Sequence, residues 1–307
     1  MYFFSSPNRN SKYIFRYFIS SKIFKSDIPI DDLAPFYKEK IEYKVSNDGL
    51  KVNDQSNYST IYKGPGSIGD FIRKISFYKY KNNFNLIIQD VGKFLIINDS
   101  EDIEIFLLDS ELKIKDNLII ESLLGPVIVF CFALEEIFCF HASAVKYKNK
   151  AILFIGKSGS GKSTLADYLD KNSGGEFERI ADDIVPISTK KDKFYCLPHF
   201  PQLKLSGTQQ YPLSKPSQVN IKSIYILNKD NRRTSVKIEA LEPKEKVFSL
   251  ISNTVASRLF DRGLNKNHLE FCSKVVSSIS VKKITFKHDI KQLPQIYDLI
   301  LDDIESS

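Results

Sequence analysis

Glycine and proline are scarce in this chain, with 13 and 12 of the 307 residues. Chains without a packed core are usually rich in such residues and poor in apolar ones. Here hydrophobic residues make up 42% of the chain and charged residues 26%. The composition therefore predicts a globular protein with a proper core and no long disordered part. The length allows one large domain or two ordinary ones.

Cysteine is also rare, and its positions match no metal site. Cys131, Cys139, Cys196 and Cys272 form no C-x-x-C pair, and no histidine stands at zinc-ligand spacing from them. Cys131 and Cys139 lie in strongly apolar runs, where cysteine is usually a small buried hydrophobe. We expect a reduced, cytoplasmic protein.

Long apolar runs and a targeting segment are missing as well. The first residues, MYFFSSPNRNSKYIF, have no basic start followed by an apolar stretch. The longest uncharged apolar run covers residues 122–134, which is 13 residues. A membrane span needs about 20. We expect a buried helix there and no membrane association.

The charge of the chain is modestly basic, with a formal net charge of +7. Its 44 basic and 37 acidic residues are mixed along the sequence, as on a solvated surface. No basic run followed by base-stacking aromatic residues matches a nucleic-acid-binding motif. We therefore expect no nucleic-acid partner.

The pattern of apolar residues changes near residue 119. Residues 1–118 predict short strands and turns, including strands in 41–53, two strands in 85–99 around Asp90-Val91-Gly92, and one in 101–109. We interpret this part as an α+β accessory domain without a recognisable motif, in which acceptor recognition is one possible role. Residues 119–307 alternate between predicted strands (136–145, 151–156, 179–187, 219–228, 236–242 and 282–289) and predicted helices (163–172, 244–257, 265–278 and 293–306). This alternation predicts an α/β domain.

Residues 156–163 read GKSGSGKS, a full match to the phosphate-binding pattern G-x-x-x-x-G-K-[ST]. A buried strand is predicted before this P-loop and an amphipathic helix after it, which is the context that the pattern requires. Glycines let the backbone N–H groups turn inward, and the free N–H groups of the following helix favour phosphate oxygens. The lysine would reach the β- and γ-phosphates, and the final hydroxyl would bind Mg²⁺. The predicted nucleotide-binding residues are Gly156, Lys157, Ser158, Gly159, Ser160, Gly161, Lys162, Ser163 and Thr164.

Two adjacent acids, Asp182 and Asp183, follow about twenty residues after Lys162. A carboxylate at the end of a neighbouring strand is what a Mg²⁺–phosphate site needs. Two acids suggest that one holds Mg²⁺ and the other takes the proton of an attacking hydroxyl. Since side chains alternate along a strand, both can serve only at a bend or a strand end. A surface turn is the alternative interpretation of this pair.

Together, FHASAVKYKNKAILFIGKSGSGKSTLADYL and RIADDIVPI resemble the catalytic domain of HPr kinase/phosphorylase and its relatives, among them lasso-peptide kinases. The stretch LPHFPQLKLSG (197–207) is similar to a Pro-x-Leu-Lys-Leu segment of those relatives. The resemblance covers roughly residues 120–210. It implies a P-loop kinase fold akin to phosphoenolpyruvate carboxykinase, with a mixed sheet. The resemblance also favours a homo-oligomer.

The same resemblance implies roles for single residues. Lys162 and Ser163 would serve ATP and Mg²⁺, Asp182 would be the general base, and Asp183 would be a Mg²⁺ ligand together with Ser163. His141 matches the family's histidine near the transferred phosphate, with a core histidine as the alternative. Arg258 is the candidate for stabilising the transferred charge, with Arg262 or a surface role as alternatives.

The sequence also departs from the HPr kinases proper. Their Gly-rich segment after the acidic pair, which is tied to HPr binding and to the reverse reaction, is missing here. The predicted function is therefore transfer of the ATP γ-phosphate to a hydroxyl, such as that of Ser, on a peptide, protein or small molecule. A nucleotide-binding regulatory module without catalysis is the alternative. An ABC-type ATPase does not fit, because LSGTQQ (205–210) follows the acidic pair instead of preceding it.

Overall fold

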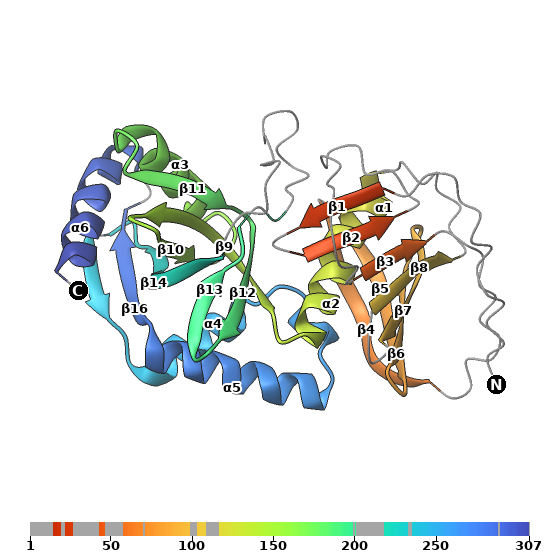
Figure 1. Cartoon of the computed structure of the whole chain (residues 1–307). Helices are drawn as coiled ribbons and strands as arrows, with labels where there is room; N and C mark the ends of the chain where they lie inside the picture. Colours follow the sequence, from red (N-terminus) through yellow and green to blue (C-terminus); the bar gives the residue numbers. More distant parts are fainter. Residues whose placement is uncertain are drawn as a thin grey trace. The chain divides into compact units, whose positions relative to one another are not determined.

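A computed structural model of the chain describes residues 58–69, 71–98, 103–108, 117–198, 200, 218–232, 235–287 and 289–306, and the backbone of residues 15–19, 22–26 and 43–46. The chain divides into two compact units (Figure 1). Among the described residues, unit 1 comprises those up to Cys131 and the short segment Arg258–Asp261. Unit 2 comprises the others. Most of the segment 197–207 lies outside the described residues.

Unit 1 is built on one eight-stranded sheet in the order β1-β2-β3-β8-β7-β6-β5-β4. Neighbours from β4 to β8 pair antiparallel, whereas β3 pairs parallel with β2 and β8. The strands are β1 (Phe15–Ile19), β2 (Lys22–Ser26), β3 (Tyr43–Ser46), β4 (Ser59–Ile68), β5 (Phe71–Tyr80), β6 (Asn83–Ile88), β7 (Gly92–Asn98) and β8 (Ile103–Leu108).

The predicted strands of this unit are confirmed at 85–99 and 101–109, where β6, β7 and β8 lie. Of the segment 41–53, β3 is confirmed and the residues after it lie outside the described part. The Lys- and Tyr-rich stretch SFYKY is part of β5, although no strand was predicted there. Its alternation explains this, because Ile75 and Phe77 are buried while the residues between and beside them are not.

A helix of three segments lies mostly in unit 1 and continues into unit 2. The segments are α1 (Asn117–Ser122), a π-helical turn (Leu123–Val127) and α2 (Ile128–Leu134). Pro126, which lacks an N–H group, lies inside the π-helical turn. The ring of Phe130 packs edge-on against Phe77 and Phe84, with centroids 4.8 and 4.7 Å apart. The predicted buried helix is thus confirmed, although it is longer than the predicted run.

By length and composition alone, residues Asn117–Leu134 are apolar enough to cross a membrane, and 67% of this window is buried inside the protein. Burial of this kind is also what a core helix shows. The helix contains both the predicted domain boundary after residue 118 and the division of the two units after Cys131.

Unit 2 contains a mixed sheet in the order β10-β9-β12-β13-β14-β16-β15, with β11 paired to β9. β14 pairs parallel with β10 and with β16, and the other pairs are antiparallel. The strands are β9 (Phe138–Tyr147), β10 (Lys150–Ile155), β11 (Phe177–Ala181), β12 (Ile184–Lys190), β13 (Lys193–Cys196), β14 (Val219–Lys229), β15 (Lys237–Ala240) and β16 (Ser280–Phe286).

The helices of unit 2 are α3 (Lys162–Asn172), α4 (Pro243–Ser252), α5 (Arg262–Ser278) and α6 (Leu293–Glu305). Apolar residues of α3 and α6 form one core with β9, β10, β14 and β16. On β9 the alternate side chains Phe138 and Phe140 instead contact Phe271 of α5. The sheet therefore has helices on both faces, as the predicted α/β alternation requires.

Two details of unit 2 differ from the sequence prediction. The helix predicted over 244–257 ends at Ser252, because Thr254 leaves it to form a β-bridge with Phe140. β13 was not predicted, and it forms a hairpin with β12 around Lys191 and Asp192, both at positive φ. Cys131, Cys139, Cys196 and Cys272 are all buried, which confirms the prediction for the first two.

Candidate functional site

The Gly-rich loop joins the end of β10 to the start of α3, as the motif predicts. Gly159 and Gly161 have φ angles of 73° and 95°, which side chains disfavour. A Cβ at Gly156 would lie 2.7 Å from the Ser160 hydroxyl oxygen and 3.1 Å from the Leu227 carbonyl oxygen. Glycine at 156 is thus required by close packing, and glycine at 159 and 161 by backbone conformation.

Lys162 is folded back over this loop. Its ammonium donates to the carbonyl oxygens of Gly156, at 2.9 Å, and Lys157, at 3.2 Å. Burial lowers the pKa of Lys162, and the negative charges of Asp183 and Asp182 partly oppose that shift. A desolvated ammonium held at the mouth of a loop is well suited to receive phosphate oxygens.

The remaining loop residues differ in exposure. Ser160 is buried, and its hydroxyl oxygen has no hydrogen-bond partner. Exposed positions, from which side chains or N–H groups can meet a ligand, are Lys157, Ser158, Gly159, Ser163 and Thr164.

The two acids lie in a bend between β11 and β12, the arrangement that the sequence analysis required. Both strands pair with β9, and the N–H of Ile184 donates to the Asp182 carbonyl over 2.8 Å. Asp183 has φ 61°, in the left-handed region. The bend leaves Asp182 5% exposed but the Asp183 side chain 61% exposed. The two carboxylates therefore have different environments and can do different work.

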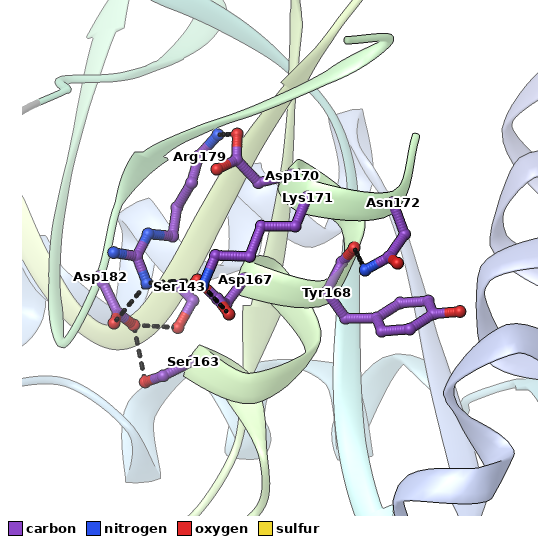
Figure 2. A network of polar contacts seen from close by, with 9 residues as sticks. All are labelled: Ser143, Ser163, Asp167, Tyr168, Asp170, Lys171, Asn172, Arg179 and Asp182. Carbon is purple, nitrogen blue, oxygen red and sulfur yellow. Dashed lines mark hydrogen bonds and ion pairs between the residues drawn. The ribbon is translucent and has the colours of Figure 1, made fainter. Parts of the chain in front are cut away.

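Asp182 is the centre of a polar network (Figure 2). Its Oδ1 accepts hydrogen bonds from the hydroxyls of Ser163, at 2.8 Å, and Ser143. Its Oδ2 lies 3.8 Å from Nη1 of Arg179, and the same guanidinium nitrogen lies 3.9 Å from Asp167 on α3. The acidic pair and the P-loop helix are thus brought together at Ser163.

Sequence reasoning missed Ser143 and Arg179. Ser143 lies two residues after His141 on β9, so alternation places both side chains on the same face of the sheet. That spacing was the signal that could have identified Ser143. Arg179 precedes Asp182 by three residues across the end of β11, and no local pattern marks it.

His141 lies beside the other acid. Its Nδ1 is 3.9 Å from Oδ1 of Asp183, and its side chain is 51% exposed. The alternative interpretation as a core histidine is therefore excluded. The structure thus gathers His141, Ser143, Asp182, Asp183 and the P-loop within unit 2.

Arg258 lies in the short segment that belongs to unit 1. It is exposed, and its Nη1 donates to the Pro65 carbonyl at 2.6 Å and to the Tyr62 hydroxyl at 3.3 Å. Arg262 is the exposed first residue of α5. A role of either arginine at the phosphate stays a prediction.

The residues around Ser163 fit a magnesium ion. The Ser163 hydroxyl and the Asp182 carboxylate bonded to it are hard oxygen ligands of the kind that Mg²⁺ prefers, usually together with phosphate oxygens and water. Within the described ranges, no group of three or more His, Cys, Asp or Glu could hold a metal by itself.

Comparisons with known proteins give little beyond this geometry. No protein-family model matches the sequence, and no curated protein matches it. Among solved structures, the chain is similar to the Hpr(Ser) kinase/phosphatase from Coxiella burnetii, with 14% identity, over 54% of this chain and 95% of that one, at a TM-score of 0.28. The function is accordingly argued from the site itself.

Proposed function

We propose that this chain is a kinase that transfers the γ-phosphate of ATP to a hydroxyl of a peptide, protein or small molecule, with serine as the expected acceptor type. The observation that carries the proposal is the hydrogen bond from Ser163 to Asp182 at 2.8 Å. It joins the last residue of the P-loop motif to a buried carboxylate in the bend between β11 and β12. A site for phosphoryl transfer needs this combination, because catalysis rests on positioning and charge neutralisation.

The residues divide the work as follows. The P-loop N–H groups and Lys162 bind the β- and γ-phosphates, and Ser163 and Asp183 hold Mg²⁺. Bound Mg²⁺ would neutralise charge on the phosphates. Asp182 accepts the proton of the acceptor hydroxyl, and Ser143 and Arg179 fix the orientation of its carboxylate. His141, next to Asp183, meets the transferred phosphoryl group or the acceptor.

One observation favours the exchanged assignment of the two acids. Asp182 is already bonded to Ser163, the expected Mg²⁺ ligand, whereas the more exposed Asp183 lies beside His141. In that case Asp183 would accept the proton, and Asp182 would stay on the magnesium side. The Mg²⁺ dependence of transfer by the two Asp→Asn variants separates the assignments, because the variant at the metal position needs more Mg²⁺ for the same rate.

A second candidate function is a regulatory module that binds a nucleotide without chemistry. It is favoured by the contacts of the Asp182 carboxylate. This carboxylate already accepts hydrogen bonds from two serine hydroxyls and lies near an arginine. The test is incubation of the full chain with labelled Mg-ATP and pools of peptides and metabolites. A labelled product supports the kinase. Tight, Mg²⁺-dependent ATP binding without any product in all pools would support the regulatory module instead.

A further inference from the structure

A second lysine contacts the P-loop from the side opposite to the acidic pair. Lys229 is the last residue of β14, and its ammonium donates to the carbonyl oxygen of Gly159. Lys229 lies outside the phosphate-binding pattern, and nothing in the proposed phosphate chemistry uses it. Its contact with the loop is nonetheless direct.

The topology explains how Lys229 reaches the loop. β14 runs parallel to β10, and the last residue of β10 pairs with Ile226. β14 therefore continues for three residues beyond that pair, beside the loop that leaves β10. The end of β14 adjoins the N-terminus of α3, because Lys229 and Phe286 lie next to Gly161.

The two strands that pair with β10, which are β9 and β14, indicate how a bound nucleotide would be oriented. β9, on one side, carries His141 and Ser143 and pairs with the strands that flank Asp182 and Asp183. Transfer of the γ-phosphate under the proposed function would occur on that side. The nucleoside end must then extend away from the acids, and β14 is the neighbour of β10 on the other side.

The side chain of Lys229 suits a nucleoside better than a phosphate. In a phosphate-binding loop the N–H groups point inward and the carbonyl oxygens point outward. Lys162 also binds carbonyl oxygens of the loop, so Lys229 differs from it by its place at the end of β14, which pairs with β10 on the side away from β9. A Cβ on Gly161 would lie 3.9 Å from Cε of Lys229 and 4.0 Å from the ring of Phe286, so both lie next to the start of α3. Burial also lowers the pKa of Lys229.

We propose that the carboxyl end of β14 is the nucleoside subsite, where the ammonium of Lys229 stays on the loop and its four-carbon stem packs against the base or ribose. This rests on the proposed nucleotide binding but not on catalysis. Long basic side chains commonly cover apolar surface with their methylene groups while the charged end is bound elsewhere.

The test compares ligands that share phosphates but differ in the nucleoside. Binding of Mg-ATP, Mg-ADP and inorganic tripolyphosphate to the full chain is measured by isothermal titration calorimetry for wild type, Lys229→Ala and Lys274→Ala. Lys274 is an exposed lysine of α5 and serves as the control for loss of one charge. We expect Lys229→Ala to weaken the binding of ATP and ADP about tenfold and the binding of tripolyphosphate less than about twofold. We expect Lys274→Ala to bind all three ligands like wild type.

Equal weakening of ATP and tripolyphosphate would overturn the proposal, because it would mean that Lys229 acts on the phosphates or on the loop conformation. Unchanged binding of all three ligands would overturn it as well. If wild type binds neither ATP nor tripolyphosphate, the proposed function itself fails. If wild type binds ATP and Lys229→Ala binds it equally, only the subsite is wrong. A thermal melt of each variant shows that it is folded.

Discussion

The hydroxyl of Ser163 donates a hydrogen bond to the buried carboxylate of Asp182 over 2.8 Å, across 19 residues of sequence. This contact connects the helix that follows the P-loop with the bend between β11 and β12. It joins the Gly-rich loop and the acidic pair in one site, so under the proposed function a change in either is expected to alter phosphoryl transfer.

Replacement of Lys162 by alanine is expected to abolish phosphoryl transfer. The ammonium is folded over the loop and donates to the carbonyl oxygens of Gly156 and Lys157, and loss of such a charge costs about 100-fold or more in rate. Rates are measured with labelled ATP and the acceptor found by the screen. Lys274→Ala is the matched control. Transfer by Lys162→Ala at more than a tenth of the wild-type rate would contradict the role of Lys162.

Asp182→Asn is expected to leave ATP binding within a few-fold of wild type while transfer stops. The amide keeps the shape of the side chain but cannot take the proton. Binding is measured by calorimetry and transfer by labelled product. Full transfer activity in this variant would show that the base assignment is wrong. A raised Mg²⁺ requirement with residual transfer would place Asp182 on the metal side instead.

Ser143→Ala tests the positioning of that carboxylate. Ser143 is fully buried and donates to Oδ1 of Asp182. A hydrogen bond to a charged group contributes about 1.5–3 kcal/mol, so we expect kcat to fall about tenfold or more while the Kd for Mg-ATP stays nearly constant. Ser273→Ala, at an exposed serine of α5, is the control. A parallel loss of ATP binding and thermal stability, without a specific loss of kcat, would reduce Ser143 to a packing role.

Arg258→Ala and Arg262→Ala together test the predicted charge-stabilising arginine. If Arg258 serves the transferred phosphoryl group, its loss lowers kcat by about 100-fold with ATP binding retained, whereas Arg262→Ala behaves as wild type. The reverse pattern would assign the role to Arg262. Unchanged rates in both variants would mean that neither arginine serves the phosphoryl group. The role of Arg258 would then be structural, through its hydrogen bonds to Tyr62 and Pro65 in unit 1.

Stability in acid should depend on His268, which is buried between α5 and β9. Its Nε2 lies 2.9 Å from the Thr254 hydroxyl and 3.4 Å from Sγ of Cys272, and desolvation lowers its pKa from 6.5 to about 4. At a pH below the pKa that His268 has in the unfolded chain, the unfolded chain binds a proton on this imidazole, whereas the folded chain keeps the imidazole neutral. Stability is therefore lost as pH falls from about 6.5 to about 4, by up to about 3 kcal/mol.

Urea unfolding at pH 7.5 and pH 5 measures this loss. His268→Gln removes the titrating group and is expected to flatten this part of the pH dependence, even if the variant is less stable at both pH values. An equal difference between the two pH values in wild type and His268→Gln would show that other groups cause the acid sensitivity.

Much of unit 2 was predictable from the sequence because its signals are local. The apolar run before the P-loop, the glycines at 156, 159 and 161, and the alternation along β9 and β14 each lie within one short segment. Predicted element boundaries were wrong where a partner that is distant in the sequence determines where an element ends. α4 ends early because Thr254 pairs with Phe140, and β13 exists because β12 and β14 flank it.

The sequence by itself determined the Gly-rich loop between a strand and a helix and the presence of two adjacent acids close to a strand end, since both depend on residue types at fixed spacing. Only the tertiary structure decided that Asp182 is buried against Ser163 and Ser143 while Asp183 is exposed beside His141. The reason is that a left-handed bend at Asp183 breaks the alternation of the strand. Likewise, the contact of Lys229 with Gly159 arises from the pairing of β14 with β10, and no local sequence pattern encodes which strands become neighbours.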